Sequence, residues 1–359
     1  MALPEGLLVF RSKPDSLVGL DIGSTSVKLM ELSKRDGRLT LESCGIEPVP
    51  PRAAPETHAR ASGTHISDAE GVGEAIKRLA RRTRPGTKRA AVAIGGTASF
   101  TKVIEMDASL SDEEMESEIA LQTPNHLPYP AEAAAIDFEV LHLSERDPTR
   151  VEVLFAACRR DDAELLEDAV ELGGLKARVL DIEAFALARA FELLQPDFGS
   201  HAAIFDIGAN STTLSVLHGD KLVHTREQAF GGRMLTEEIQ RHHGISATES
   251  ARITTRVEPA DEPIFSQFCN GLLDQMARAL QFFYSANPSG RVDQVYLAGG
   301  VAGVPNLSGH AARVLGVPVA VADPFGGITV PDSTDTPDLA ENAPAFMLAC
   351  GLALRAFEP

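Results

Sequence analysis

The stretch LVGLDIGSTSVKLMEL, residues 17–32, decides the fold of this chain. Its apolar residues lead to a carboxylate, and a run of small residues follows before the apolar alternation resumes: Asp21, Gly23, Ser24, Thr25 and Ser26. Alternation on both sides of a glycine-containing break is typical of two strands joined by a turn. The stretch therefore predicts a hairpin whose tip carries an aspartate and several hydroxyl groups.

A second stretch, AAIFDIGANSTTLSVL at residues 202–217, repeats this pattern. Both copies read Asp-Ile-Gly, and leucines occupy matching positions after it: Leu29 with Leu214, and Leu32 with Leu217. A strong hairpin signal follows each copy, Asp36-Gly37 in the first and Gly219-Asp220 in the second. The chain is therefore expected to contain two β-meanders, each with an Asp-x-Gly turn between its first two strands.

The chemistry of the two turns suits a phosphate group. Glycine lets the backbone approach a phosphate closely with its N–H groups, and serine and threonine add hydroxyl donors. Two aspartates that face each other across a cleft repel unless a cation lies between them, and a hydrated Mg²⁺ carrying nucleotide phosphates suits that place. Lys28 can reach back as a point charge for a phosphate. One Asp-x-Gly sequence alone is usually only a turn, but two copies with matching strands favour phosphate binding.

Composition excludes several other classes. Hydrophobic residues make up 44% of the 359 residues, which is enough for a substantial core in two domains or one large split one. The formal net charge of −18 argues against nucleic acid and against broad adhesion to anionic lipid. Four widely spaced cysteines without a Cys-x-x-Cys pair indicate a reducing cytoplasm. There is no signal-peptide pattern or eighteen-residue apolar stretch, so we expect an intracellular protein with a flexible tail at residues 1–14.

The chain resembles the actin-like ATPase superfamily and, within it, the PilM family of type IV pilus assembly. The resemblance runs from LVGLDIGSTSVKLMELS to APAFMLACGLALRAF and includes KVIEMDASLSDEEMESEI, VEVLFAACRR and FGGRMLTEEIQ. It implies an α/β, actin-like ATPase fold with two ribonuclease-H-like domains and an FtsA/PilM-type α/β insertion in domain I.

The resemblance also implies a site for ATP and Mg²⁺ between the two domains. The first phosphate loop corresponds to Asp21, Gly23, Ser24, Thr25, Ser26 and Lys28, and the second to Asp206, Gly208, Asn210, Ser211 and Thr212. Asp21 and Asp206 take the magnesium-facing positions, with contact through water. The adenosine stretch resembles VYLAGGVAGVPNL and offers Gly299, Gly300, Val301 and Pro305, while Gly231 and Gly232 lie beside the cleft.

Two positions leave alternatives open. Glu183 aligns with the residue that positions the attacking water in relatives that hydrolyse ATP, where a carboxylate can act as a base. A helix N-terminal acid favoured by the macrodipole explains Glu183 equally well. The Ala-Glu-x-x-Lys pattern with which relatives contact adenosine is not met in GISATESARITTRVEP, residues 244–259. Phosphate binding is therefore predicted more firmly than adenosine binding.

The expected domain order follows from the resemblance. Domain I begins with residues 15–87, is interrupted by the inserted subdomain at 88–177, and continues with a connecting helix at 178–199. Domain II has its core at 200–230 and 291–335 and a helical subdomain at 231–290. Residues 336–359 form the C-terminal helix of domain I. The alanines and glycine of the two connecting helices allow close helix approach, although a plain buried helix would carry them as well.

The resemblance implies an ATP-binding scaffold of the inner-membrane pilus platform, located in the cytoplasm and peripheral to the inner membrane. Its expected partner is the cytoplasmic N-terminal segment of PilN, in a groove between domain I and the insertion, for which residues 118–130 are the best regional candidate. Other pilus platform and motor proteins are further candidate partners, and membrane contact is expected only through partners. The alternatives are an FtsA- or MreB-like filament-forming ATPase and a small-molecule kinase, for which the sequence offers no separate acceptor motif. Glu183 leaves slow ATP hydrolysis open.

Overall fold

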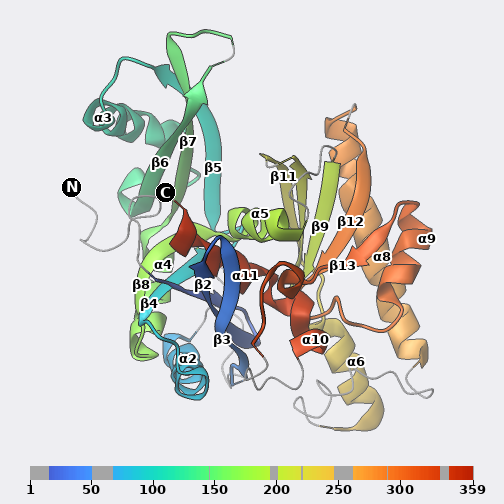
Figure 1. The fold of residues 1–359 in the computed structure, drawn as a ribbon. Helices are drawn as coiled ribbons and strands as arrows, with labels where there is room; N and C mark the ends of the chain where they lie inside the picture. The colour runs from blue at the N-terminus through green and yellow to red at the C-terminus, as the bar shows by residue number, and fades with distance from the viewer. Residues whose placement is uncertain are drawn as a thin grey trace.

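The computed structural model describes residues 16–50, 68–144, 146–194, 201–219, 221–245, 262–288, 290–331 and 339–358. Two five-stranded sheets form the centre of this part of the chain (Figure 1). The first has the order β3 (Arg38–Pro48), β2 (Ser26–Arg35), β1 (Val18–Ile22), β4 (Arg89–Ile94) and β8 (Lys176–Ile182). The second has the order β11 (Lys221–Gln228), β10 (Thr212–His218), β9 (His201–Ile207), β12 (Val292–Ala298) and β13 (Val319–Val321).

The two sheets are built in the same way. In each, the first three strands form an antiparallel meander, and the remaining two strands run parallel to the first strand of that meander. Asp36 and Gly37, at the turn between β2 and β3, both have positive φ, as a tight hairpin turn requires. The predicted pair of β-meanders is confirmed.

Two helices lie between the sheets: α5 (Glu183–Leu194) and α11 (Met347–Leu354) (Figure 1). Their buried side chains join residues of both sheets in one hydrophobic core. Small residues set the spacing of this layer, since a Cβ at Gly351 would lie 1.7 Å from the Ala186 carbonyl oxygen of α5. A Cβ at Gly19 of β1 would lie 2.0 Å from a carbonyl oxygen of α11. Close approach of the two connecting helices, which their small residues suggest, is therefore present.

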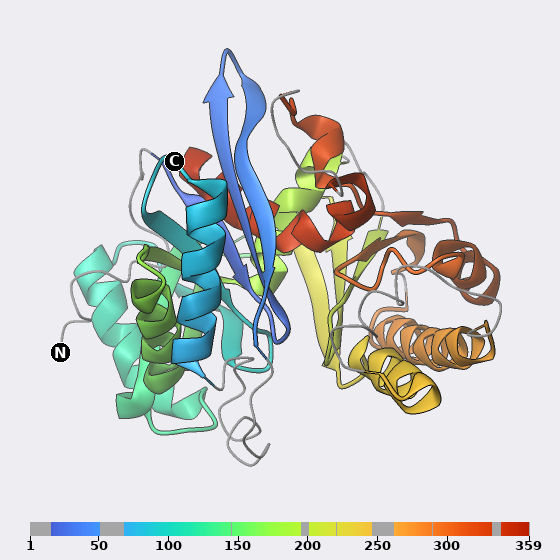
Figure 2. The same cartoon turned by 90° about the horizontal axis from the view of Figure 1, so that it is seen from below.

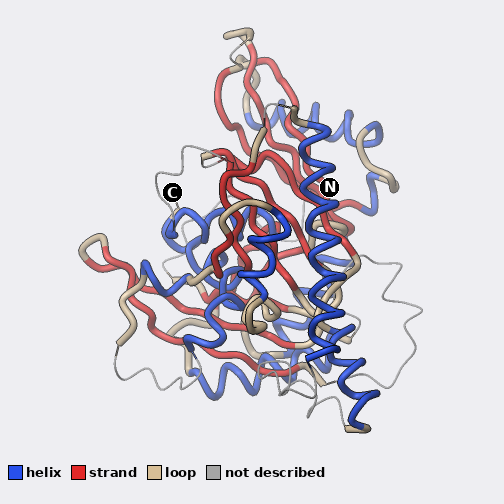
Figure 3. The backbone as a smooth tube through the Cα atoms, turned by 90° about the vertical axis from the view of Figure 1, so that its right-hand side faces the viewer, coloured by secondary structure: helices blue, strands red, loops and turns tan. Residues whose placement is uncertain are grey.

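Helices also cover the outer face of each sheet. The pair α2 (Ala69–Thr83) and α4 (Arg160–Leu172) packs on the first sheet (Figure 2). Three helices pack on the second: α6 (Arg233–His243), α8 (Glu262–Ala286) and α9 (Leu307–Leu315). Figure 3 shows from the side how helices flank the strands of this half. A short helix, α10 (Leu339–Asn342), precedes α11.

A third sheet projects from the first half of the molecule (Figure 1, upper left). Its order is β5 (Ser99–Asp107), β7 (Arg150–Arg159) and β6 (Ala134–Leu143). One face packs on α3 (Asp112–Gln122) through a small core that includes Met106, Ile119 and Phe155. Ser111 and Glu114 form a capping box at the start of α3.

The projecting part with the third sheet contains fewer residues than the insertion expected over residues 88–177. Strand β4 lies inside the first large sheet, between β1 and β8, and β8 begins at Lys176 as a strand, before the expected connecting helix. Helix α4 packs on α2 and on this same sheet. The sequence did not indicate this arrangement because β4 and β8, which pair in parallel, are separated by more than eighty residues of the chain.

Two of the expectations lie outside the described residues. They concern the tail at residues 1–14 and most of residues 244–259, the segment in which the Ala-Glu-x-x-Lys pattern is not met. Among the residues that are described, none of the helices combines the length and the apolar character that a membrane span needs.

Candidate functional site

The two Asp-x-Gly turns have the same construction. In the first, Asp21 lies opposite Lys28 in the β1–β2 pair, and the Gly23 N–H donates to the Ser26 carbonyl at 3.0 Å. In the second, Asp206 lies opposite Thr213 in the β9–β10 pair, and the backbone bond from residue 208 to residue 211 is 2.9 Å long. Each carboxylate therefore stands at the end of a central strand, on a turn that its glycine N–H closes.

The small residues of these turns differ in their surroundings. Ser24 and Ser211 are partly exposed, and Thr25 and Asn210 are exposed, so these four side chains remain accessible to a ligand. Thr212 is only 3% exposed, and its hydroxyl donates to the Phe230 carbonyl at 2.7 Å. This hydrogen bond ties β10 to the segment after β11. The Thr212 hydroxyl therefore has a structural partner in the protein, whereas the sequence suggested a phosphate as its partner.

Glycines from two other segments pack against the second turn. The Gly232 N–H donates to the Gly208 carbonyl at 2.9 Å, and a Cβ at Gly231 would lie 2.7 Å from that same oxygen. Gly299 has a φ of 86°, and a Cβ there would lie 2.4 Å from an Asp206 carboxylate oxygen. The start of α6 and the end of β12 can approach Asp206 this closely only because these positions are glycines.

Of the remaining predicted residues, Val301 contacts the same turn. The Val301 N–H donates to the Ile207 carbonyl at 3.3 Å. The Val301 side chain packs against Gly232, where a Cβ would lie 2.6 Å from Val301 Cγ2. Gly300 is exposed and faces open space. Pro305 is exposed and precedes α9, which begins at Leu307 rather than at the proline.

The ionisable groups of both turns act on one another. Lys28 Nζ lies 3.0 Å from Asp21 Oδ2, and Asp21 is 8% exposed. Burial, and then the charge of Asp21, raise the pKa of Asp206 to about 6, while Lys28 opposes the shift. Burial lowers the pKa of the Lys28 amine, but the charges of Asp21, Asp206 and Glu183 outweigh it and raise the value overall. The ionisable groups of the two acidic turns therefore lie close enough to act on one another, and the region between these turns is here called the cleft.

Glu183 adds a third carboxyl group to this cleft from the first turn of α5. Burial, followed by the charges of Asp21, Asp206 and Glu227, raises the pKa of Glu183 to about 8, and Lys28 opposes the shift. Most Glu183 side chains are thus protonated at pH 7 in the ligand-free protein. In that form the group can donate a hydrogen bond but cannot accept a proton as a base.

Glu227 is a residue of this cleft that sequence reasoning missed. Asp206, Thr213 and Glu227 are register neighbours on β9, β10 and β11, so their side chains share one face of the sheet. Glu227 Oε2 is buried, and it has no hydrogen-bond partner in the part of the chain that the structure describes. Glu227 could have been found from the sequence by pairing Asp206 with Thr213 across the first turn and Thr213 with Glu227 across the next hairpin.

The donor set of the cleft fits a hydrated divalent cation. Carboxylates from both sheets face one lysine, so a positive charge placed among them relieves their repulsion. No group of three His, Cys, Asp or Glu side chains in the described part of the chain is arranged to ligate a metal ion directly. Contact through water, as Mg²⁺ commonly keeps, is therefore the arrangement these residues suit.

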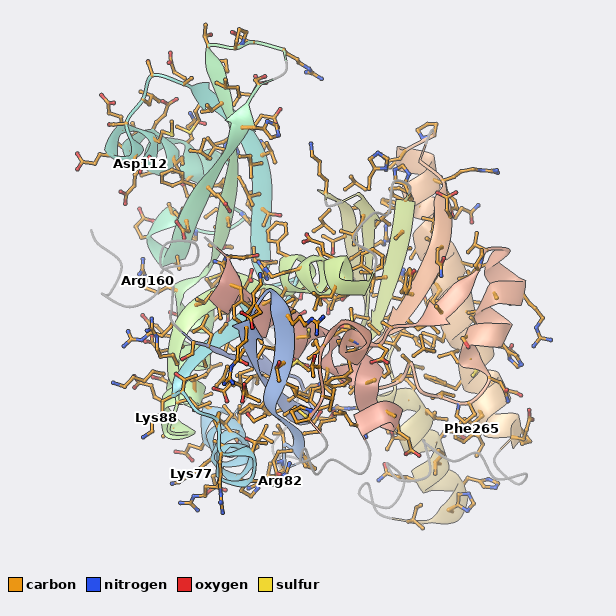
Figure 4. All side chains as sticks on the ribbon, viewed as in Figure 1. Lys77, Arg82, Lys88, Asp112, Arg160 and Phe265 are labelled. Carbon is orange, nitrogen blue, oxygen red and sulfur yellow. The ribbon has the colours of Figure 1, made fainter. Side chains whose placement is uncertain are left out.

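A second hollow, here called the junction groove, lies where the third sheet meets the first half of the molecule. Its empty space, counted together with the open solvent at its mouth, is about 630 Å³. Its walls are the ends of β4, β7 and β8, the starts of β5 and β6, and the first two turns of α4. Arg160, labelled in Figure 4, marks its position at the base of the third sheet. Most of the side chains that line it are apolar, and the expected region 118–130 contributes none of the described lining residues.

One strand connects the groove with the cleft between the two acidic turns. Leu180, Asp181 and Ile182 at the end of β8 line the junction groove, and the next residue is Glu183. Asp181 is 1% exposed and lies 2.9 Å from the Arg189 guanidinium of α5 and 3.7 Å from that of Arg355. The groove wall is thus ionically tied to both helical segments of the central layer.

Two solved structures are similar to this chain over nearly all of its length. A structure titled "PilM-PilN type IV pilus biogenesis complex" has 26% identity and a TM-score of 0.78, with 96% of this chain and 99% of that chain covered. The ethanolamine utilization protein EutJ from Carboxydothermus hydrogenoformans has 17% identity and a TM-score of 0.54, with 97% and 92% covered. The predicted actin-like ATPase fold is confirmed.

The family comparison agrees with the first of these structures. Residues 19–357 match the family model described as type IV pilus assembly protein PilM. This range includes both Asp-x-Gly turns, the third sheet, the junction groove and the central helices. The chain belongs to the type IV pilus assembly protein PilM family.

Proposed function

We propose that this protein is a nucleotide-dependent scaffold of type IV pilus assembly, which binds Mg·ATP in the cleft and a PilN segment in the junction groove. The observation that carries the proposal is the mutual electrostatic effect of Asp21 and Asp206 across the cleft, with Lys28 beside them. An arrangement of this kind costs free energy in the empty protein and suits a ligand that brings a cation.

The proposal gives each part of the cleft a task. The backbone N–H groups and accessible hydroxyls of the two turns bind the phosphates, and Lys28 supplies a positive charge. Asp21 and Asp206 hold the water shell of Mg²⁺, which when bound neutralises phosphate charge. Gly300 leaves room for the remainder of the nucleotide, because no atom lies within 4 Å of the place that a Cβ would take there, while Gly299 lets the end of β12 pack against Asp206.

Hydrolysis is proposed to be slow at most. Positioning a water as a base requires an ionised carboxylate, and in the ligand-free protein burial together with three neighbouring acids raises the pKa of Glu183 to about 8. A scaffold needs only that the bound nucleotide holds one arrangement of the two sheets. We therefore assign the cleft to binding rather than to rapid turnover.

The junction groove is proposed as the site of the PilN N-terminal segment. An apolar groove between two structural layers is a suitable place for an extended peptide, and the similar solved structure is a complex of PilM with PilN. Binding there would hold a cytoplasmic protein at the inner membrane through its partner. We therefore propose the junction groove as the contact region for PilN, instead of residues 118–130, which the sequence suggested.

We further propose that nucleotide and peptide affect each other through β8 and the central helices. Asp181 lines the groove, while its ion pairs reach α5 and the segment after α11. A movement of these helices when the cleft closes would therefore displace the groove wall. Allosteric coupling of this type commonly changes affinity by about 5- to 150-fold, and it acts equally in both directions.

Calorimetry on the full chain tests the proposed function. We expect binding of ATP that requires Mg²⁺, independent binding of a synthetic PilN N-terminal peptide, and turnover well below about 1 s⁻¹, the low end of ordinary enzyme rates. Absence of either binding event would contradict the scaffold, and turnover above that rate would indicate an enzyme. Sedimentation with and without ATP tests the filament alternative, since a scaffold of this kind stays unpelleted in both conditions.

A further inference from the structure

The junction groove combines an apolar floor with an acidic edge. Ile94, Ile136, Leu180 and Ile182 contribute branched aliphatic side chains, and several alanines line the groove beside them. Glu164 and Glu167 line the same groove from α4, three residues apart and therefore neighbours on one helix face. The groove thus offers a place for an apolar side chain directly beside two carboxylates.

These two glutamates differ from the other charged groups of the groove. Arg160 donates to the Ala134 carbonyl at 2.8 Å, and Asp181 is paired with Arg189. In the described part of the chain, neither Glu164 nor Glu167 forms a hydrogen bond or an ion pair within 4 Å. Neither carboxylate therefore has a direct partner in the described part of the chain, while Arg160 lies one turn before Glu164 on α4 and Arg178 acts on the charge of Glu167.

The surroundings of Glu167 make this arrangement unfavourable in the empty groove. Glu167 is half-buried, and burial raises its pKa, with further contributions from Glu171, Asp168 and Glu164. Arg178 is the one basic residue that opposes this shift. A positive charge brought to the mouth would be attracted by both groove-lining glutamates and would relieve the repulsion between them.

We propose that the junction groove selects a peptide in which an aliphatic side chain is followed or preceded closely by lysine or arginine, whose charge pairs with Glu164 and Glu167. This inference rests on the proposed function, and its occupant is the cytoplasmic N-terminal segment of PilN. Cytoplasmic segments next to a membrane span are enriched in Lys and Arg, which matches the charge that the groove edge requires. The apolar floor provides affinity, and the acidic edge provides selectivity and orientation.

The expected size of the effect follows from the exposure of the pair. Glu164 is exposed and Glu167 is half-buried, so each contact resembles an ion pair at an interface rim. Removing both negative charges should weaken peptide binding about tenfold at low salt. The loss should shrink as ionic strength rises, because salt screens exposed charges.

The test measures binding of a synthetic PilN N-terminal peptide by calorimetry at 50 and 300 mM salt (about 14 and 6 Å of screening length). The Glu164→Gln/Glu167→Gln variant should bind it about tenfold more weakly at low salt, with little remaining salt dependence. The matched control is Asp168→Asn/Glu171→Gln, which removes the same charge from the same helix at positions outside the groove lining. The control should retain most of the wild-type affinity and salt dependence.

A second peptide makes the result specific. Replacing its lysines and arginines by glutamine should reproduce the loss in the wild-type protein and cause no further loss in the Glu164→Gln/Glu167→Gln variant. Equal binding of both peptides to the wild-type protein, or an equal loss in variant and control, would overturn the inference while leaving PilN binding intact. Failure of every peptide to bind would instead refute the proposed function.

Discussion

Replacing Glu183 by glutamine should stabilise the ligand-free protein, and the gain should grow with pH. Glutamine keeps the shape of the side chain but cannot ionise. In the folded chain, burial and the charges of Asp21, Asp206 and Glu227 raise the pKa of Glu183 to about 8, against an ordinary value of 4.5. The folded state therefore binds this proton more tightly than the unfolded state does, and the wild-type protein loses stability wherever the unfolded state has released it.

The magnitude follows from the shift. Below pH 4.5 both states hold the proton, so Glu183 costs nothing there. Between pH 4.5 and about 8 the cost rises by about 1.4 kcal/mol for each pH unit, and above that range it stays constant at no more than about 5 kcal/mol. Since relaxation of neighbouring groups reduces such costs, we expect Glu183→Gln to be about 2–4 kcal/mol more stable than wild type at pH 8 and nearly equal at pH 4.5.

Urea unfolding followed by circular dichroism, without nucleotide or Mg²⁺, measures this difference at several pH values between 4.5 and 9. Glu237→Gln on the exposed side of α6 is the control, and it should show no comparable growth of stability with pH. A difference between Glu183→Gln and wild type that does not change with pH would refute the reasoning. It would mean that Glu183 ionises near its ordinary pKa and that the cleft does not collect negative charge.

Three further substitutions test other parts of the structure. Gly299→Ala places a Cβ 2.4 Å from a carboxylate oxygen of the second acidic turn, at a φ of 86°. It should weaken Mg·ATP binding at least tenfold by calorimetry, about 1.4 kcal/mol, whereas Gly300→Ala, which faces open space, should bind normally. Gly351→Ala places a Cβ 1.7 Å from a carbonyl oxygen of α5 and should destabilise the fold by about 1–3 kcal/mol in thermal unfolding. Gly309→Ala in α9 meets no neighbouring atom and should instead add about 0.5–1 kcal/mol, so equal effects of these two would contradict the close helix crossing. Asp181→Asn should reduce the ratio of peptide affinities measured with and without Mg·ATP while each ligand still binds alone; an unchanged ratio would exclude β8 as the connection.

Much of this architecture is written in local sequence patterns. The acidic turns, the hairpins that follow them and the meanders depend on residues that are close in the sequence, and all of these are present as expected. The small residues of the connecting helices likewise indicated a close crossing, which Gly351 makes possible. The repeat then predicted two sheets of the same construction, because two similar units place their Asp-x-Gly turns at corresponding positions.

Other features depend on contacts between distant segments. Strand β4 belongs to the first sheet because it pairs with β1 and β8, and its own six residues would serve equally well in the third sheet. Glu227 faces the cleft through a register that runs across two hairpins. The junction groove is assembled from six separate elements, so its location could not be found from one segment such as residues 118–130.

The central claim is that Asp21 and Asp206 hold one magnesium-bound nucleotide between the two sheets. The most direct test is calorimetry of Mg·ATP binding to the wild-type protein and to Asp21→Asn, Asp206→Asn and the double variant, with circular dichroism to verify folding. Our account predicts that each single variant loses most of the affinity and that the double variant loses little more, because both carboxylates serve the same ion. Wild-type affinity in both folded single variants would contradict it.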